Sequence, residues 1–480
     1  MSKSFYRFRS ATNLLDGYNE LEKQTIYFAP PEQLNDPMEG YRDIFWRGDL
    51  IARENLFSHY LFCLERLTCL LHISGEDHRM TANDIPVFGS TEDLPTETYK
   101  QLFRKIKERF LKHSDISVFI GSISSRSTPV RREELNFYLD CIHLPAIKII
   151  FDVYIEENLS QESNRLDEDC YALVHDIVTN DFIGILEKSI AIGESEESIV
   201  TKIFTAKKHL KEQTYLINKH NGDISQSKPN RNLVMNEFSS SYLERLKEIT
   251  FPKWYTSCFM SECENSSVWG HYGDNHTGMC LIFDSDLIED KRYIKLNGIT
   301  GWGSSGPSYG KNVMELHSID YEEGFGEIDF FTSIGSLPIP VLNKMWYVDE
   351  NKNLNSCAHE MNADENAWRS NYWSNFIRDI KIKSKDWEYE NEYRLILNSS
   401  ITDLSEKDRR TLTYDFSSLK GIIFGINSKE EDKLQVMKII EEKCLNSSRD
   451  DFKFYQAYYS SDDNCIKKAE MGLIKFFTNV

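Results

Sequence analysis

Residues Asp386 to Leu397 read DWEYENEYRLIL, and the interpretation of the rest of the chain starts from them. In a strand, residues two apart share a face, so Glu390, Glu392 and Arg394 would project together while the aromatic side chains face the other way. Two carboxylates about 7 Å apart on one face repel each other unless a cation or a ligand hydroxyl lies between them. The alternatives are a solvated face neutralised by Arg394 and a neighbouring strand, or a helix with Glu390 and Arg394 paired at i,i+4.

Strand-like and helix-like patterns divide the chain into a core and an insertion. Short β-rich stretches occur over residues 5–8 and 25–29, and again as WYTSCFM (254–260), GMCLIFD (278–284), LKGIIFG (419–425) and FYQAYY (454–459). Helical periodicity dominates residues 49–242 and returns over 367–383 and 429–445. The sequence therefore predicts an α+β core, residues 1–48 and 243–480, interrupted by a large α-helical insertion over residues 49–242.

One stretch rich in Gly and Ser, GITGWGSSGPSYG (298–310), interrupts the second part of the core. We expect a mobile loop there rather than a phosphate-binding loop, because no Gly-Lys-Ser/Thr sequence follows to open a helix.

Charge and composition exclude several classes of protein. The chain has 480 residues and a formal net charge of −20, so its long-range field repels a nucleic-acid backbone and argues against a nucleic-acid partner. No stretch approaches the roughly 18 apolar residues of a membrane helix, and the first residues lack the apolar core of a signal peptide. Ten cysteines at irregular spacing contain no CxxC pair, which argues against a disulfide scaffold. We expect a cytoplasmic protein with no membrane partner.

Two segments near the N-terminus offer polar groups for a ligand. In YRFRS, Arg7 and Arg9 share a face of the expected strand, and a guanidinium fork suits a phosphate or a carboxylate as well as an ordinary ion pair. In LNDPMEG, Asn35, Asp36 and Glu39 surround a rigid Pro37. This loop is equally consistent with ligand binding and with Asp36 capping the next segment.

The window CFMSECENSSVWGHYGDNHTGMC (258–280) contains three cysteines and two histidines. Zinc sites usually present ligands as closely spaced pairs, C-x2–4-C and H-x3–5-H, whereas Cys258 and Cys280 lie inside apolar runs where cysteine acts as a small hydrophobe. We expect two strands joined by a polar block with a short helix over Ser267 to Tyr272, and no metal. A zinc site and a Cys-His nucleophile pair remain the alternatives.

Three blocks of the chain together resemble the bacterial family known as domain of unknown function 2971. They are YRFRS with IYFAPPEQLNDPMEG, then SCFMSE with VWGHYGDNHTGMCLIFD, then DWEYENEYRLIL followed by LKGIIFG, in the order of the family. The helical middle of the chain lies outside this resemblance. The family is itself distantly similar to the ADP-ribosyltransferase superfamily, and that likeness implies a split, mixed or antiparallel β-sheet core.

The second resemblance also implies roles for particular residues. Arg9 or Arg7 would anchor the pyrophosphate or ribose of NAD, Ser257 or Tyr272 would supply the middle-strand group, and Glu392 would be the catalytic carboxylate. Glu390 would be the preceding acid that assists the acceptor. The remaining predicted substrate-binding residues are Asn35, Asp36, Trp269, His271 and Arg394, with Trp269 or Tyr272 stacking on nicotinamide. The sequence does not decide whether Arg9, His271 and Glu392 converge on one pocket, and the interpretation as an enzyme fails if they lie on separate surfaces.

The leading functional hypothesis is an enzyme that uses NAD as its substrate, as a bacterial toxin or antiphage effector with a protein or nucleotide acceptor. A phage-derived molecule or a partner protein would trigger it, and the insertion would recognise targets. The first alternative is a non-catalytic sensor whose pocket is lined by LNDPMEG and WGHYGDNH. The second alternative is an RNA-directed phosphotransferase or nuclease, against which the net charge of −20 weighs.

Overall fold

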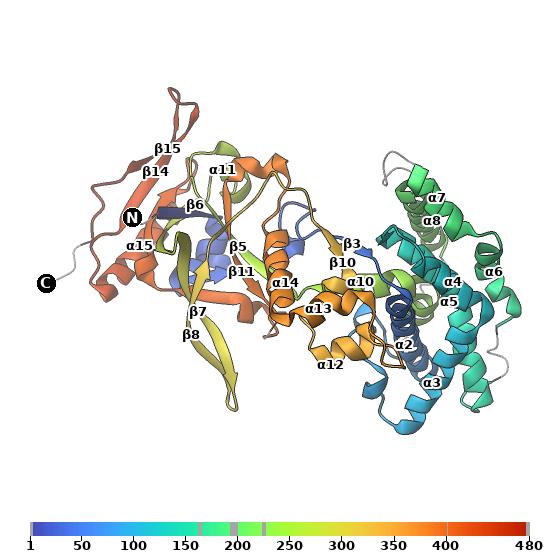
Figure 1. Ribbon diagram of the computed structural model, residues 1–480. Helices are drawn as coiled ribbons and strands as arrows, with labels where there is room; N and C mark the ends of the chain where they lie inside the picture. The colour runs from blue at the N-terminus through green and yellow to red at the C-terminus, as the bar shows by residue number, and fades with distance from the viewer. Residues whose placement is uncertain (1–2, 162–165, 193–199, 223–226, 401, 477–480) are drawn as a thin grey trace. The chain divides into compact units, whose positions relative to one another are not determined.

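The chain folds into two compact units of mixed α and β structure, which confirms the α+β prediction (Figure 1). The structure is a computed structural model, and it describes residues 3–161, 166–192, 200–222, 227–400 and 402–476. Unit 1 comprises Met1–Tyr41, Lys253–Phe325 and Ile377–Val480, and unit 2 comprises Arg42–Pro252 and Gly326–Phe376. Residues 326–376, assigned above to the core, therefore group with the helical segment.

Unit 1 is built on one large sheet with the strand order β15-β14-β13-β6-β1-β5-β11-β9. The bounds are β1 Lys3–Arg9, β5 Trp254–Met260, β6 Met279–Ile288, β9 His317–Ser318, β11 Glu392–Asn398, β13 Leu419–Phe424, β14 Lys453–Ser460 and β15 Cys465–Glu470. Neighbours pair antiparallel except β13 and β14, whose parallel pairing needs the crossover helix α15 (Glu430–Ser447). The sheet is thus mixed and predominantly antiparallel.

Alternation along the strands gives the sheet two apolar faces. Phe5 of β1 packs with Leu281 and Phe283 of β6 on one face, which Val436 of α15 covers. Phe8 packs on the opposite face with side chains that include Cys280 and Trp269. Because side chains point alternately to the two sides of a strand, Arg7 lies on the Phe5 face and Glu392 on the other.

The sheet opens between its two central strands. β1 pairs with β6 from Lys3 to Arg9 and β5 pairs with β11 along its whole length, but β1 and β5 share only the pair Tyr6 and Met260. Beyond that pair, Thr256 of β5 exchanges backbone hydrogen bonds of 2.8 Å with Ala29, which follows β2 (Thr25–Tyr27). The two strands consequently diverge and leave a gap in the sheet.

The Gly/Ser-rich stretch is a β-hairpin, so the prediction of a mobile loop is wrong. β7 (Lys291–Gly303) and β8 (Gly306–Glu315) pair along their length, and Gly306 has a φ of 115° at the turn. The base of the hairpin is anchored because Ile294 and Leu296 are buried and β12 (Thr411–Tyr414) pairs with both β2 and β7. Figure 1 shows the hairpin projecting from the sheet of unit 1.

Unit 2 is mainly helical, as predicted for most of residues 49–242. Its helices include α2 Leu50–Ser74, α3 Glu97–Lys112, α4 Ser114–Ser124, α5 Arg132–Glu156, α6 Ala172–Thr179, α7 Phe182–Ile192, α8 Val200–His220 and α10 Phe238–Thr250. A small sheet adds β10 (Glu327–Asp329), β3 (Asp43–Trp46) and β4 (Val130–Arg131). The helix predicted over 367–383 is α14, Glu365–Ile380.

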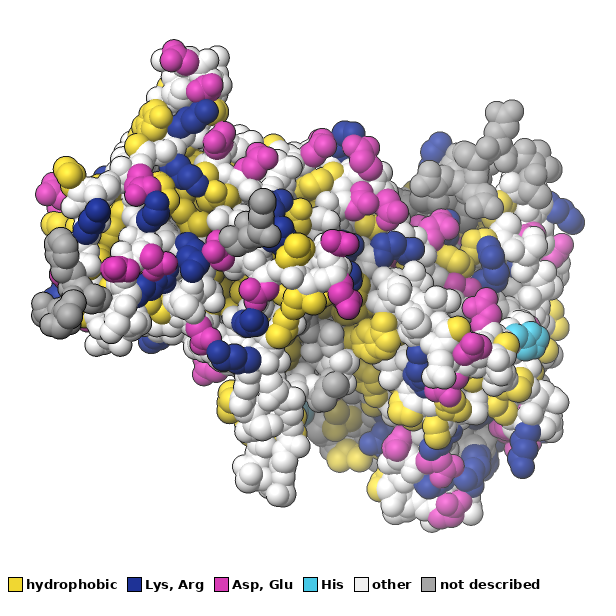
Figure 2. Space-filling view, turned by 60° about the vertical axis from the view of Figure 1, so that its left-hand side comes forward, with side chains coloured by type: hydrophobic (Ala, Val, Ile, Leu, Met, Phe, Trp, Pro, Cys, Tyr) yellow, Lys and Arg dark blue, Asp and Glu magenta, His cyan; other side chains and the backbone are white. Residues whose placement is uncertain are grey.

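Two observations concern the distribution of charge on the surface and the possibility of a membrane-spanning helix. On the face drawn in Figure 2, basic and acidic side chains are interspersed. Within the described ranges, no helix combines the length and the apolar character needed to span a membrane.

Two buried histidines hold the helices of unit 2 together. His143 donates from Nε2 to the Val234 carbonyl at 2.9 Å, so its Nδ1 accepts from the Tyr60 hydroxyl at 2.8 Å. His59 likewise donates to the Val87 carbonyl at 3.0 Å and accepts from the Tyr242 hydroxyl at 2.8 Å. Each ring is satisfied in its neutral form, and burial lowers the pKa of both histidines to about 4.

Acid should therefore destabilise unit 2 through these histidines. An unfolded histidine titrates near about 6.5, so below that pH the unfolded chain binds protons that the folded unit excludes, and stability is lost as the pH falls toward 4. We expect a loss of about 1–2 kcal/mol per histidine by pH 5, measured by denaturant unfolding across the pH range. His143→Gln should flatten this dependence, whereas the matched variant of the exposed His175, His175→Gln, should not. An unchanged slope in His143→Gln would contradict the assignment.

Candidate functional site

A small cavity of about 130 Å³ lies in the gap between β1 and β5. β1 contributes Arg7, Phe8 and Arg9, and Tyr272 comes from α11 (Ser266–Tyr272), the short helix that the sequence predicted. The remaining lining residues are Tyr27, Ala29, Leu34, Thr256, Ser257, Cys258 and Met260. The cavity exists because the two strands stop pairing at Tyr6, which leaves backbone and side-chain polar groups of β5 facing β1.

Arg7 spans the gap from β1 to β5. Its Nη1 donates to the Ser257 hydroxyl and, at 3.4 Å, to the carbonyl of Cys258. Only 6% of the residue is exposed, and burial, with a contribution from Arg9, lowers the pKa of Arg7 to about 10. The guanidinium is therefore still charged at neutral pH and supplies a fixed positive group at the cavity.

Arg9 lines the same cavity but has a partner of its own. Its Nε donates to Glu20 Oε2 at 2.7 Å, and Nη2 contacts the other oxygen of the same carboxylate. This two-point contact is the geometry that favours Arg over Lys. Arg9 thus positions Glu20 and helix α1 (Glu20–Lys23), and its charge is already compensated.

Behind the cavity lies a buried cluster of three carboxylates and two cations. Lys383 Nζ donates to Glu390 at 2.7 Å and to Glu392 at 2.9 Å. Arg394 donates from Nε to Glu392 at 2.7 Å and from Nη2 to Glu39 at 2.6 Å. All five side chains are at most 3% exposed.

The predicted strand begins later than its sequence pattern suggested. Residues Lys385–Glu390 form a 3₁₀-helix, and Asn391 adopts a left-handed conformation with φ 45° before β11 starts at Glu392. Asparagine tolerates that conformation because its short side chain bonds locally. Glu390 therefore reaches the cluster from a turn, whereas Glu392 and Arg394 share a strand face as expected.

The cluster has one more carboxyl group than it has cations, and the pKa of Glu390 lies near neutral pH. Burial raises the pKa of Glu390 to about 7, with a further contribution from Glu392 and opposition from Lys383. Burial would also raise the pKa of Glu392, but Arg394 and Lys383 outweigh it and lower that pKa below its ordinary value. Burial also raises the pKa of Glu39, so a cluster of three acids facing two cations favours retention of a proton that Glu39 and Glu390 compete for.

Two side chains connect the cavity with the cluster. The Tyr272 hydroxyl donates to Glu390 Oε1 at 2.7 Å. Cys258, which pairs with Arg394 across β5 and β11, interacts electrostatically with Glu392. Because Tyr272 and Cys258 also line the cavity, the carboxylates lie one side chain behind its wall.

The predicted site residues divide into three groups. Arg7, Arg9, Ser257 and Tyr272 meet at the cavity, and Glu390, Glu392 and Arg394 lie in the cluster behind it. Four others lie elsewhere: Asn35, Asp36, Trp269 and His271. Of Arg9, His271 and Glu392, only Arg9 lines this cavity, so the three residues do not converge on it.

The four outlying residues have local structural partners or face solvent. Trp269 is fully buried, donates to the Cys263 carbonyl at 2.8 Å and meets Phe8 edge-on, so its ring is not free to stack on nicotinamide. His271 pairs with the Tyr389 hydroxyl at 3.0 Å. Asp36 accepts from the backbone of Met38 and so fixes its own turn, and Asn35 is exposed.

Sequence reasoning missed Lys383 and did not carry Glu39 into the site. Glu39 was visible in LNDPMEG as a loop acid, but nothing in the loop shows that it reaches Arg394. Lys383 follows α14 beside Ile382, whose backbone bridges Asp320, and a lysine after a helix has no distinguishing pattern.

In the segment 258–280, Cys258 and Cys280 lie on β5 and β6 as expected. The described residues contain no group of three His, Cys, Asp or Glu side chains arranged to hold a metal ion.

Removing the central cation tests whether the cluster supports the fold. Lys383→Met should leave three buried carboxylates facing one arginine and lower the free energy of unfolding by about 3–5 kcal/mol. The matched control is Lys385→Met, because Lys385 pairs with Glu322 at the surface with both side chains more than 60% exposed. That change should alter stability by no more than about 0.5 kcal/mol. Equal effects in denaturant unfolding would show that the cluster is not a stabilising element.

The comparisons with known proteins bear on the same segment. The family model described as protein of unknown function (DUF2971) matches residues 268–395, which run from α11 to β11. No curated protein and no solved structure gives a significant match. The matched segment contains Tyr272, Lys383, Glu390, Glu392 and Arg394, and the match supports the resemblance of this part of the chain to that family.

Proposed function

We propose that unit 1 is an ADP-ribosyltransferase-like enzyme that uses NAD, with the nicotinamide end of the substrate at the gap between β1 and β5. The observation that carries this proposal is the order of three polar residues across adjacent strands. Arg7 on β1 bonds Ser257 on β5, and Glu392 begins the next strand, β11. An anchoring arginine, a hydroxyl and a carboxylate on neighbouring strands match the set that the resemblance implied.

Each group has a role that its chemistry allows. Loss of nicotinamide leaves an oxocarbenium-like ribose, and a carboxylate that bonds a ribose hydroxyl favours the developing positive charge. Arg7 supplies a permanent cation for the phosphates or the ribose. Glu390, with its pKa near 7, is the group suited to accept a proton from the acceptor, through Tyr272 at the cavity wall.

A second candidate function is a non-catalytic ligand-binding module, and one observation favours it. Lys383 and Arg394 already occupy both oxygens of Glu392. In a structural ion cluster this arrangement is complete in itself, and the cavity beside Arg7 would then bind a nucleotide or another small anion without reacting with it. For catalysis, one of these two contacts must give way when a ribose hydroxyl arrives.

NAD assays separate these functions. The wild-type chain should bind NAD in calorimetry and release nicotinamide, and Ser257→Ala should weaken binding by about tenfold because Arg7 loses its partner at the cavity. The matched control is Ser261→Ala, since Ser261 lies just beyond β5 and does not line the cavity. Glu392→Gln should keep binding and lose turnover.

The outcomes are distinguishable. If the wild-type chain binds NAD without releasing nicotinamide, the result supports the binding module and contradicts the enzymatic function. If the chain does not bind NAD, both uses of NAD are contradicted.

The pH dependence of transfer tests Glu390. If it accepts the proton of the acceptor, the rate should rise as the pH passes through about 7, because only the ionised carboxylate is a base. Glu390→Gln should abolish this rise while NAD binding persists. Glu388→Gln, an exposed neighbour, should retain the wild-type profile. A rise that survives in Glu390→Gln assigns the titration to another group.

A further inference from the structure

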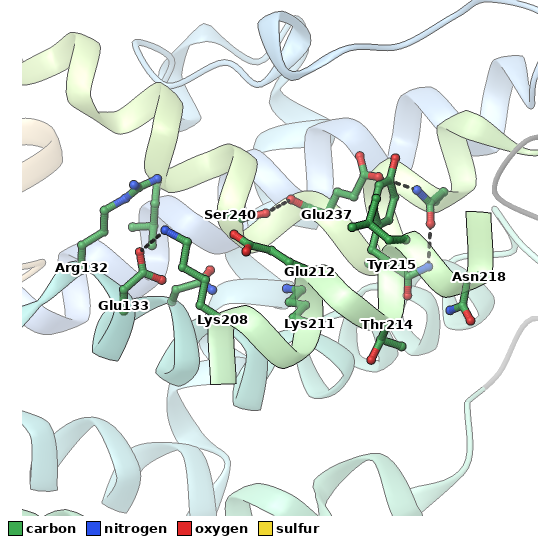
Figure 3. A pocket seen from close by; sticks show the side chains of 15 residues that line it. Arg132, Glu133, Lys208, Lys211, Glu212, Thr214, Tyr215, Asn218, Glu237 and Ser240 are labelled. Carbon is green, nitrogen blue, oxygen red and sulfur yellow. Dashed lines mark hydrogen bonds and ion pairs between the residues drawn. The ribbon is translucent and has the colours of Figure 1, made fainter. Parts of the chain in front are cut away.

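A second and larger cavity, of about 800 Å³, lies within unit 2 (Figure 3). Its walls are the first turns of α5, the second half of α8, and the π-helical turn Leu233–Glu237 with the start of α10. Cavities of roughly 300–1,000 Å³ are typical of sites for small organic ligands. The volume therefore admits a molecule of nucleotide size.

One end of this cavity carries charged groups with unused hydrogen-bonding capacity. Figure 3 shows Arg132, Glu133 and Lys208 together at that end. Arg132 contacts Glu244 through Nη2, but its buried Nε has no acceptor within the described part of the chain. Lys208 meets Glu133 at 3.3 Å, a long contact that leaves its other two N–H groups available. This end has donors for one anionic group.

A second unsatisfied atom lies one helical turn further along α5. Asn136 follows Arg132 at i+4, so the two side chains share a face of the helix. The buried Oδ1 of Asn136 has no donor among the described residues. An acceptor beside two cationic donors suits a ligand in which a hydroxyl group lies close to an anionic group.

The opposite end combines an aromatic ring with amides. Tyr215 of α8 lines the cavity there with 43% of its surface exposed; Lys219 Nζ lies 5.7 Å from the ring centroid, so stacking would use the face of the ring away from Lys219. Asn236 donates to Asn232 at 2.8 Å, and Asn232 donates to Glu237 at 2.7 Å. This chain of amide and carboxylate groups presents both donors and acceptors to the edge of a flat heterocycle.

From these contacts we propose that the cavity of unit 2 binds a nucleotide with a single phosphate. Arg132 and Lys208 hold the phosphate, Asn136 accepts from a sugar hydroxyl, and Tyr215 stacks on the base. The lining contains three cations, Arg132, Lys208 and Lys211, and three acids, Glu133, Glu212 and Glu237. Glu244, which pairs with Arg132, and Asp140, which pairs with Lys211, add two acids beside this lining, so a monophosphate meets less repulsion than a triphosphate. The site is independent of the cavity in unit 1.

Calorimetry on the full chain with the nucleosides, nucleoside monophosphates and nucleoside triphosphates of the common bases tests this site. At least one monophosphate should bind, more tightly than its nucleoside and its triphosphate. Asn136→Leu and Tyr215→Ala should each weaken that binding by about tenfold or more, whereas Tyr215→Phe should retain it because the ring and not the hydroxyl is used. The matched control is Gln213→Leu, an exposed residue of α8 that does not line the cavity.

Several results would overturn the proposal. They are an absence of binding by every monophosphate up to about 1 mM, equal affinity in Asn136→Leu and wild type, or tighter binding of the triphosphate. Ser257→Ala should leave this binding unchanged. A loss in that variant alone would place the nucleotide in unit 1 and refute the second site, without deciding whether unit 1 turns over NAD.

Discussion

The buried cluster of Glu39, Lys383, Glu390, Glu392 and Arg394 joins the loop after β2 to residues 383–394, which are distant from that loop in sequence. Glu39 comes from the loop after β2, Lys383 from the segment after α14, and the other three from β11 and the turn before it. Buried charges are tolerated only when each is paired, so the three segments must meet in one arrangement. The start of β11 at Glu392 and the position of Tyr272 in the wall of the adjacent cavity depend on that arrangement.

The imbalance within the cluster connects stability with chemistry. Two cations cannot compensate three buried carboxylates, and burial raises the pKa of Glu39 and raises that of Glu390 to about 7. A fully balanced cluster would have been a purely structural ion network. The unbalanced one keeps an ionisable acid next to the cavity, connected to it by Tyr272, and such perturbed groups are more frequent at functional sites than elsewhere.

The gap between β1 and β5 brings Arg7, Cys258 and Tyr272 to one cavity, although Arg7 and Glu392 project to opposite faces of the sheet. Side chains from both faces reach the same space only where the sheet is open. There Arg7 contacts Ser257, while Cys258 and Tyr272 lie between the cavity and the carboxylates.

In unit 2, neutral polar side chains connect buried elements. His59 and His143 satisfy both ring nitrogens without charge, which orders the helices that line the second cavity.

The sequence by itself determined the elements whose patterns are local. Short runs of β-branched, aromatic and other apolar residues located β1, β5, β6, β13 and β14, and helical periodicity located helices such as α14 and α15, because both signals lie within one element. It also placed Arg7 with Arg9, and Glu392 with Arg394, on shared strand faces. Only the tertiary structure decided that Lys383 and Glu39 complete the cluster, that Trp269 is a core residue, and that residues 298–310 pair as a hairpin. These outcomes depend on contacts between different elements, and no pattern within one element encodes which partner a buried charge or a strand edge will meet.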